Sequence, residues 1–411
     1  MQGDRVRIRA ELIKAEDGFQ IWSETYDRNI DDIFAVQDEI ATAAIAALEV
    51  NLLGGNGATV PAGPRTNALA YQAYLEAQDF FGSDSDKASL TKALAYTDQA
   101  IKLDANYGPA WALRSRILSQ MAAYALIDTP EGYRRARDNA ERSIALNPNA
   151  AHGYLALGWI QMDHDWDWKG AEASLKKAAE LEPGCAAVWR YQSWLYLTLG
   201  RLNEALELYK KVVVLDPLHA KSYSQLGYFH YFVGQNQDAE DALRKAAELN
   251  PQKEQDHVIH GQILLAEGHP EAGLSVVEKE SSRVWKTFGE SIAFRALGRN
   301  DDSNAALDKL IASHSQDAAY QIATVYAYRG ESVKAFQWLD VAYARHDAGL
   351  ACLKFDPLLN NLRQDPRYVD LVRKMHLPSW GRSRALRSCS ERNILKNKKG
   401  RFCCALHPSH E

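Results

Sequence analysis

The sequence predicts a mostly α-helical protein, built as a solenoid of repeats and preceded by a partial α/β unit. Four prolines close the phrases SIALNP, AAELEP, VVVLDP and AAELNP: Pro148, Pro183, Pro217 and Pro251. They stand 35, 34 and 34 residues apart. A fixed period of about 34 residues is typical of stacked helix-turn-helix units. Such an array presents an extended concave surface, so the pattern favours protein binding over catalysis in a deep cleft.

Composition agrees with a folded protein and limits its partners. Of 411 residues, 46% are hydrophobic and 25% are charged. The net charge is −5, but residues 379–411 carry +6, so the remainder carries −11. An acidic body argues against nucleic acid as the ligand of the array. No run of apolar residues is long enough for a membrane span and the N-terminus lacks the apolar core of a signal peptide, so we expect a cytoplasmic protein.

Residues 1–53 predict a β-hairpin followed by a helix. Polar and apolar residues alternate over residues 5–15, a turn is expected at residues 16–18, and residues 19–26 supply the returning strand. Apolar residues at helical spacing follow over residues 31–53. Because an isolated hairpin is marginally stable in water, we expect the chain to start inside an α/β domain whose earlier strands are absent. A Gly/Pro-rich linker is expected at residues 54–65.

The helical array is expected over residues 66–350, as about eight helix pairs. An aromatic residue stands near the start of successive first helices, and alanines recur in the second helices where two helices must cross closely. The period is stretched before Pro148 and shortened over residues 252–283, and it recovers over residues 315–346. Two Asp-Pro steps break the period over residues 351–378, which we interpret as a cap. Residues 379–411 are basic and lack periodicity, and we expect a disordered tail.

These repeats resemble the tetratricopeptide family, whose pattern W-x2-L-G-x2-Y, then A-x3-F-x2-A, then P is matched best by residues 151–251. A second resemblance concerns the segment RIRAELIKAEDGFQIWSETYDRNIDDIFAVQDEIATAAIAAL. It is similar to the end of the TolB-like (FlgO-like) domain that precedes such repeats in certain bacterial signalling proteins. The resemblance implies a sensing or docking part of such a protein. The alternative is a fragment of a class III adenylate or guanylate cyclase, or of a winged-helix regulator, whose active module is absent.

The family pattern implies a concave partner-binding groove lined by the first helices. The residues at its groove positions are Arg116, Trp159, Arg190, Trp194, Thr198, Ser224, Tyr228, Tyr231 and Phe232. Large aromatic side chains and arginine supply most of the energy in peptide interfaces, so we predict a protein or peptide ligand here. The competing interpretation is that Trp159, Trp194 and Tyr228 pack between adjacent helices. Replacing Trp194 and Tyr228 by alanine distinguishes these two interpretations. If the side chains face the partner, binding should be lost while helicity is retained. If they pack between helices, helicity should fall.

No catalytic, cofactor-binding or metal site is predicted. The loop acids and imidazole at Asp163, His164, Asp165 and Asp167 are suitable ligands for a cation, but charged residues in a tight loop are usually solvated, and we expect Trp166 and Trp168 to anchor this loop. In the tail, Cys403, Cys404, His407 and His410 lack the spacing of a zinc site. Cys185 and Cys352 are expected to be buried thiols. The chain contains no G-x-S-x-G or H-E-x-x-H motif, and we expect a non-catalytic scaffold of unassigned oligomeric state.

Overall fold

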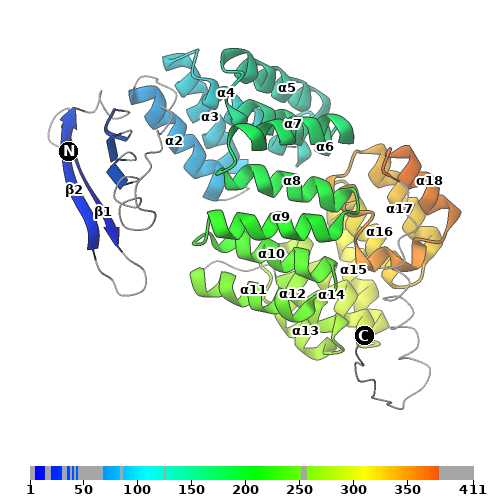
Figure 1. Ribbon diagram of the computed structural model, residues 1–411. Helices are drawn as coiled ribbons and strands as arrows, with labels where there is room; N and C mark the ends of the chain where they lie inside the picture. Colours follow the sequence, from blue (N-terminus) through cyan, green and yellow to red (C-terminus); the bar gives the residue numbers. More distant parts are fainter. Residues whose placement is uncertain are drawn as a thin grey trace, which may run out of the picture.

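The computed structural model of the protein describes residues 5–13, 20–29, 35–37, 39–40, 43–44, 68–83, 87–124, 126–250 and 257–378. Three expectations lie outside these residues: the turn at 16–18, the linker at 54–65, and the tail at 379–411 with its cysteines and histidines. Figure 1 shows a two-stranded hairpin beside a long winding array of helices.

The hairpin is formed by β1 (Arg5–Ile13) and β2 (Gln20–Asn29), which pair antiparallel with Ile8 opposite Tyr26. Alternation along β1 places its even-numbered residues on a half-buried face and its odd-numbered residues in solvent. On the exposed face, Asp27 pairs with Arg5 and Arg7. The described residues of the expected helix, 35–37, 39–40 and 43–44, are helical.

The described residues of the array form eight helix pairs, as the period predicts, and each pair packs as a helix-turn-helix unit. The first helices of the pairs are α2 (Ala68–Ser83), α4 (Gly108–Ala123), α6 (Ala151–Asp163), α8 (Ala186–Thr198), α10 (Ala220–Phe232), α12 (His257–Ala266), α14 (Arg283–Ala296) and α16 (Ala319–Tyr328). The second helices are α3 (Lys87–Leu103), α5 (Thr129–Leu146), α7 (Trp168–Leu181), α9 (Leu202–Leu215), α11 (Asn236–Leu249), α13 (Pro270–Val277), α15 (Asn300–His314) and α17 (Ser332–Ala344). The fold is therefore a mostly helical solenoid.

The helix ends follow from the residues at the turns. The second helices α5, α7 and α9 each stop two residues before a proline of the repeat phrase, because proline cannot continue the hydrogen-bonding pattern. Within a pair, the turn needs a left-handed residue, and Gly200 and Gly330 supply it with φ of 81°. The shortened pair α12–α13 corresponds to the shortened period at residues 252–283.

Small residues allow the two helices of a pair to approach closely. The recurrent alanines of the second helices, among them Ala171, Ala205 and Ala239, have no exposed surface. At Gly158 in α6, a Cβ atom would come within 2.8 Å of Leu175 Cγ in α7. The sequence interpretation of these positions as close crossings is confirmed.

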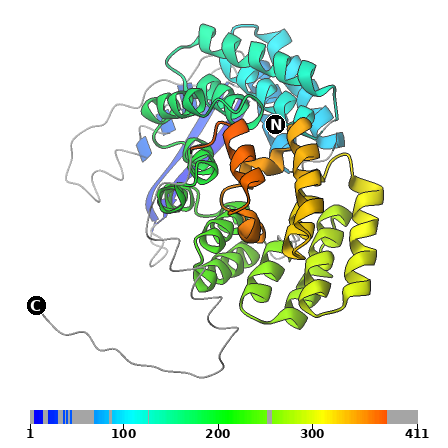
Figure 2. The ribbon, with the colours of Figure 1, turned by 90° about the vertical axis from the view of Figure 1, so that its right-hand side faces the viewer.

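The last described residues fold into the interior of the solenoid. Residues 347–378, called the C-terminal segment below, comprise η2 (Ala348–Cys352), η3 (Pro357–Leu362) and α18 (Pro366–Lys374). The acids of the two Asp-Pro steps, Asp356 and Asp365, cap η3 and α18 by accepting main-chain N–H groups. Figure 2 shows this segment inside the curve of the array, between its middle helices and α16–α17.

One apolar core joins parts of the chain that are far apart in sequence. Leu155, Leu175 and Leu195 of the middle pairs share this core with Leu339 of α17 and Leu371 of α18. The array therefore curls until its C-terminal end contacts its middle. No helix among the described residues is long and apolar enough to cross a membrane.

Candidate protein-binding face

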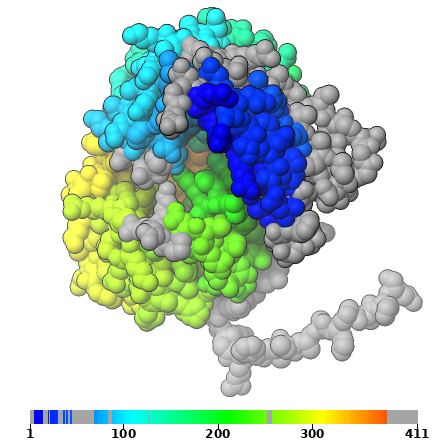
Figure 3. Space-filling view, turned by 90° about the vertical axis from the view of Figure 1, so that its left-hand side faces the viewer, coloured from blue at the N-terminus to red at the C-terminus, as the bar shows by residue number. Residues whose placement is uncertain are grey.

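The candidate site is the inner face of the array, defined here as the side that α2, α4, α6, α8 and α10 share. All nine predicted groove residues lie on these helices, and none of them is exposed. Thr198, Ser224 and Tyr231 are buried, and the other six are half-buried. Their role in binding a partner stays a prediction. Seen from the side of the hairpin, the molecular surface is hollowed between the N-terminal helices and α9–α11 (Figure 3).

Arg116 connects three first helices at the N-terminal end of the inner face. Its guanidinium lies 4.9 Å from the ring centre of Phe81 in α2 and 5.8 Å from that of Tyr191 in α8. Its Nη2 donates to the Tyr191 hydroxyl at 3.3 Å. Trp159 of α6 also packs on the Tyr191 ring, at 4.9 Å between ring centres. The result is a cation held between aromatic rings.

Arg190 lies in α8, one residue before Tyr191. Its Nη2 donates to the Ser222 hydroxyl of α10 at 3.3 Å. The Nε atoms of Arg116 and Arg190 are buried without a hydrogen-bond partner, and neither guanidinium has a carboxylate within 4.0 Å, as far as the described residues show. Partly burying a cation without a matching anion is costly, and these two guanidinium groups have only uncharged partners among the described residues.

The middle of the inner face is packed against its neighbours. The Trp194 ring contacts Phe229 of α10 edge-on at 5.2 Å. The Thr198 hydroxyl donates to the Trp194 carbonyl at 3.0 Å, so this polar group is satisfied within α8. The side chains of Ser224 and Tyr228 both make interactions with their surroundings. Packing between helices and binding of a partner are both consistent with these positions.

The C-terminal segment covers the far end of the inner face. Phe355 packs on Phe232 with 4.6 Å between ring centres, and Lys354 Nζ donates to the Leu199 carbonyl at 2.8 Å. Burial, followed by the nearby Asp356 carboxylate, raises the pKa of the Tyr231 hydroxyl. A surface that the sequence predicts for an external ligand therefore already contacts the chain's own C-terminal segment.

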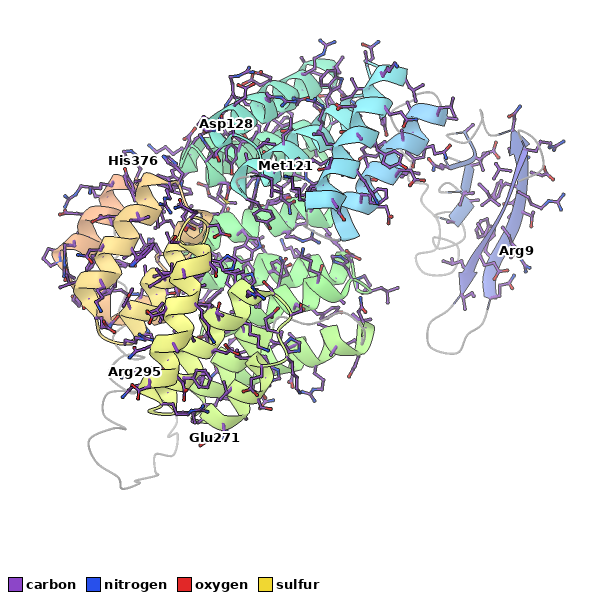
Figure 4. All side chains as sticks on the ribbon, turned by 180° about the vertical axis from the view of Figure 1, so that it is seen from behind. Arg9, Met121, Asp128, Glu271, Arg295 and His376 are labelled. Carbon is purple, nitrogen blue, oxygen red and sulfur yellow. The ribbon has the colours of Figure 1, made fainter. Side chains whose placement is uncertain are left out.

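The Asp-rich loop between α6 and α7 closes the curl of the array. Trp166 adopts φ of 53°, is buried, and stacks on His346 at 4.4 Å after α17. Trp168 Nε1 donates to the Met375 carbonyl at 2.7 Å. Figure 4 labels His376, the next residue, on the edge of the C-terminal segment that faces the N-terminal repeats. The two tryptophans anchor the loop, as predicted, and also hold the C-terminal segment.

The acids of this loop are engaged by protein groups. Asp163 accepts from the Tyr133 hydroxyl at 2.5 Å, and burial raises its pKa. Asp165 pairs with Arg137, and Asp167 caps α7 through Gly170 N at 3.0 Å. Within the described ranges, no group of three or more metal-ligating side chains comes together.

The expected burial of Cys185 and Cys352 is only partly right. Cys185 and Cys352 are free thiols and both are half-buried. Cys185 precedes the first turn of α8, and Cys352 ends η2, where burial raises its thiol pKa.

Sequence reasoning overlooked several residues of the inner face. Tyr191 links Arg116 to Trp159, but it lies outside the nine positions of the family pattern. The sequence pattern predicts a terminal cap at Lys354 and Phe355, which the structure brings into contact with the inner face. A signal for Phe355 existed, since an aromatic residue immediately before an Asp-Pro step falls outside any helical periodicity.

Comparisons with known proteins agree with the repeat architecture. Residues 167–220 and 288–349 match one tetratricopeptide repeat model, and residues 220–253 match another. A putative adenylate cyclase 3 of Rhizobium meliloti is 28% identical over 167 residues, which cover 38% of this chain and 28% of that protein. The transcriptional regulator HilA of Salmonella typhimurium is 29% identical over 173 residues, covering 42% of this chain and 30% of that protein. The chain thus spans less than a third of the length of these curated relatives.

Among solved structures, the Cut9–Hcn1 hetero-tetramer of the APC/C is 15% identical, with a TM-score of 0.49 over 83% of this chain and 60% of that chain. Tetratricopeptide arrays are scaffolds that bind other proteins on extended surfaces. The repeat models identify residues 167–253 and 288–349 as tetratricopeptide repeats, and the other described helix pairs of the array have the same helix-turn-helix form.

Proposed function

We propose that the inner face of this scaffold binds an acidic segment of a partner protein. The observation that carries the proposal is the pair Arg116 and Arg190, whose buried Nε atoms have no hydrogen-bond partner among the described residues. Within the described part of the chain, their Nη2 atoms donate to neutral hydroxyls, at Tyr191 and Ser222, and Arg190 also contacts the Tyr209 hydroxyl. A carboxylate of the partner would supply charge-assisted hydrogen bonds to both arginines, and the adjacent aromatic rings would contact its apolar side chains.

The test is a selection of peptides from a random display library on the intact chain. The wild-type chain is expected to enrich peptides with Asp or Glu next to an aromatic residue. The double variant Arg116→Gln, Arg190→Gln should lose this enrichment and keep its helical circular dichroism. Arg367→Gln is the matched control, because Arg367 is exposed and already pairs with Asp365. Enrichment of the same acidic peptides by the double variant would refute the proposal.

We infer further that this binding serves bacterial signalling, as the sensing or docking part of a larger regulator. The support is the similarity to HilA and to the putative adenylate cyclase, which is confined to 42% and 38% of this chain. Translation of the DNA upstream of Met1 tests this idea. A regulatory module that continues in frame into VRIRAEL would support it, and an in-frame stop codon followed by a ribosome-binding site would count against it.

The division of the chain is likewise a proposal. We assign residues 1–53 to the end of a TolB-like domain, 54–65 to a linker, 66–350 to the array, 351–378 to the cap and 379–411 to a tail. The hairpin and the helical residues after it support the first assignment. Limited proteolysis should remove residues 1–53 while sparing 66–378. Equal protection of both parts would argue against the division.

A further inference from the structure

A polar pocket lies beside the turns of the helix pairs α14–α15 and α16–α17. Its volume is about 330 Å³, and it is lined by Arg295, Asn300, Ser303, Asn304, Arg329 and Glu331. Arg295 stands in the last turn of α14, and it is exposed. Figure 4 labels it at the edge of the molecule. This volume is at the lower end of the range for small-molecule sites.

Arg329 is a buried cation in the wall of this pocket. Its side chain is only 5% exposed, and its Nε has no hydrogen-bond partner among the described residues. Its Nη1 donates to Asn304 Oδ1 at 3.0 Å, and its Nη2 donates to the Ser303 hydroxyl at 2.6 Å and to the Ser303 carbonyl. These partners are neutral. The Glu331 carboxylate lies 3.9 Å from Nη1, but it forms a closer pair with Lys334 at 2.8 Å. Burial lowers the pKa of the Arg329 guanidinium, because the charged form is poorly solvated there.

The two asparagines of the pocket keep their amide donors, because arginines occupy their oxygens. Asn304 Oδ1 accepts from Arg329, and Asn300 Oδ1 accepts from Arg295. An amide whose oxygen accepts a hydrogen bond still has two N–H donors on its nitrogen. Over the ranges that the structure describes, neither amide nitrogen has a partner, and Arg295 uses only its Nη1. The pocket wall therefore holds two cations and several unused donors.

These donors and charges match a phosphate group. A phosphate monoester carries a charge of about −1.5 to −2 at pH 7 and three strong acceptor oxygens. Guanidinium groups supply the opposite charge and a geometry suited to paired hydrogen bonds with phosphate. The amide nitrogens add further donors. A carboxylate has a single charge and fewer oxygens, so it would leave more of these donors unpaired.

We propose that this pocket binds a phosphate group, either as free phosphate or as part of a small phosphate ester. Four side chains would hold it: Arg295, Asn300, Asn304 and Arg329. The pocket is built from α14, α15 and the turn between α16 and α17, whereas the acidic segment of the proposed function would bind on α4 and α8. It is a further ligand site on the same scaffold and does not rest on the proposed function.

Isothermal titration calorimetry on the full chain tests the proposal, with glycerol 3-phosphate and inorganic phosphate as separate ligands. We expect at least one of them to bind with a Kd of about 1 mM or tighter, since several charge-assisted hydrogen bonds form. Tighter binding of glycerol 3-phosphate would identify an ester as the ligand. Equal or tighter binding of inorganic phosphate would identify free phosphate. Absence of binding by both at about 10 mM would overturn the proposal.

Two variants at exposed positions locate the binding. Asn300→Asp places a carboxylate at the pocket and keeps the oxygen that accepts from Arg295, so the chain should fold but bind at least about tenfold more weakly. Arg295→Gln removes one cation and should weaken binding by a similar factor. Asn236→Asp is the matched control, because Asn236 begins α11 as Asn300 begins α15 and does not line the pocket. It should bind like the wild type.

The double variant Arg116→Gln, Arg190→Gln separates this pocket from the inner face. It should bind the phosphate ligand like the wild type, so a failure of the proposed function can be told apart from a failure here. Circular dichroism checks that Asn300→Asp and Arg295→Gln are folded. Undiminished binding by these two folded variants would overturn the proposal, and so would loss of binding in the double variant alone.

Discussion

Trp168 Nε1 donates a 2.7 Å hydrogen bond to the main-chain carbonyl of Met375, 207 residues later in the chain. Both residues are buried, with Met375 at 0% exposure. The bond joins the third helix pair to the end of the C-terminal segment, and it shows that the array is closed on itself.

Trp168→Phe measures how much the hydrogen bond between Trp168 and Met375 stabilises the fold. The ring volume is largely retained, but the Met375 carbonyl loses its donor in a buried environment. We expect the free energy of unfolding to fall by about 1–3 kcal/mol in urea denaturation, the cost of an unsatisfied buried polar group. Trp285→Phe, at a half-exposed tryptophan of α14, should change stability by less than about 0.5 kcal/mol. Equal losses in the two variants would contradict the assignment.

The raised pKa of Asp356 predicts that the free energy of unfolding depends on pH. Its carboxyl accepts from the Tyr320 hydroxyl at 3.0 Å, and burial raises its pKa from 3.8 to about 6. A raised carboxyl pKa stabilises the fold at low pH, and this contribution is lost as the pH rises through about 6. From pH 5 to pH 7 the wild type should therefore lose about 1 kcal/mol relative to Asp356→Asn. Urea denaturation at both pH values measures the difference, and parallel pH profiles would refute it.

The lowered pKa of Lys354 predicts that stability rises with pH in a higher pH range. Burial lowers the pKa of its amine from 10.5 to about 8, so the charged form is disfavoured in the folded chain. The penalty is present below pH 8 and fades as the pH rises from 8 toward 10.5. Between pH 7 and pH 9 the wild type should gain about 1 kcal/mol relative to Lys354→Met. A constant difference between the two proteins over this range would contradict the burial of the charge.

Two helix glycines, one crowded and one in open space, allow the tightness of helix packing in the array to be tested. In α6, a Cβ at Gly153 would come within 3.0 Å of the Ile144 main-chain nitrogen and 3.2 Å of the Ala140 oxygen in α5. In α2, a Cβ at Gly82 would meet no atom within 4 Å. Gly153→Ala should lower the free energy of unfolding by about 1–3 kcal/mol through overpacking. Gly82→Ala should raise it by up to about 1 kcal/mol through helix propensity, and thermal denaturation compares the two.

Much of the fold could be predicted because repeat contacts are local. A proline, an alanine at the crossing and an aromatic residue near the helix start each act within one unit or its neighbour, so their spacing already encodes the helix pair. Residues 351–378 were recognised as a break in this period for the same reason. The sequence does not predict which helices this segment contacts, because no local pattern specifies contacts between residues far apart in the chain.

At the candidate site too, the sequence could predict only the features that depend on local pattern. The family pattern placed Arg116, Trp159 and Trp194 on the inner face, since a groove position depends only on the phase of the helix. It could not show that Tyr191 bridges Arg116 and Trp159. It also could not show that Phe355 covers Phe232, since the two lie more than three helix pairs apart in the sequence.

The sequence by itself determined the helical solenoid and the approximate number of its pairs. Tertiary structure alone decided that the solenoid closes through Trp168 and Met375, and that its own C-terminal segment occupies part of the inner face. The physical reason is that small rotations between neighbouring units add up along the array. Each rotation depends on how neighbouring helices pack, and only their sum over many units brings the C-terminal segment beside α8 and α10.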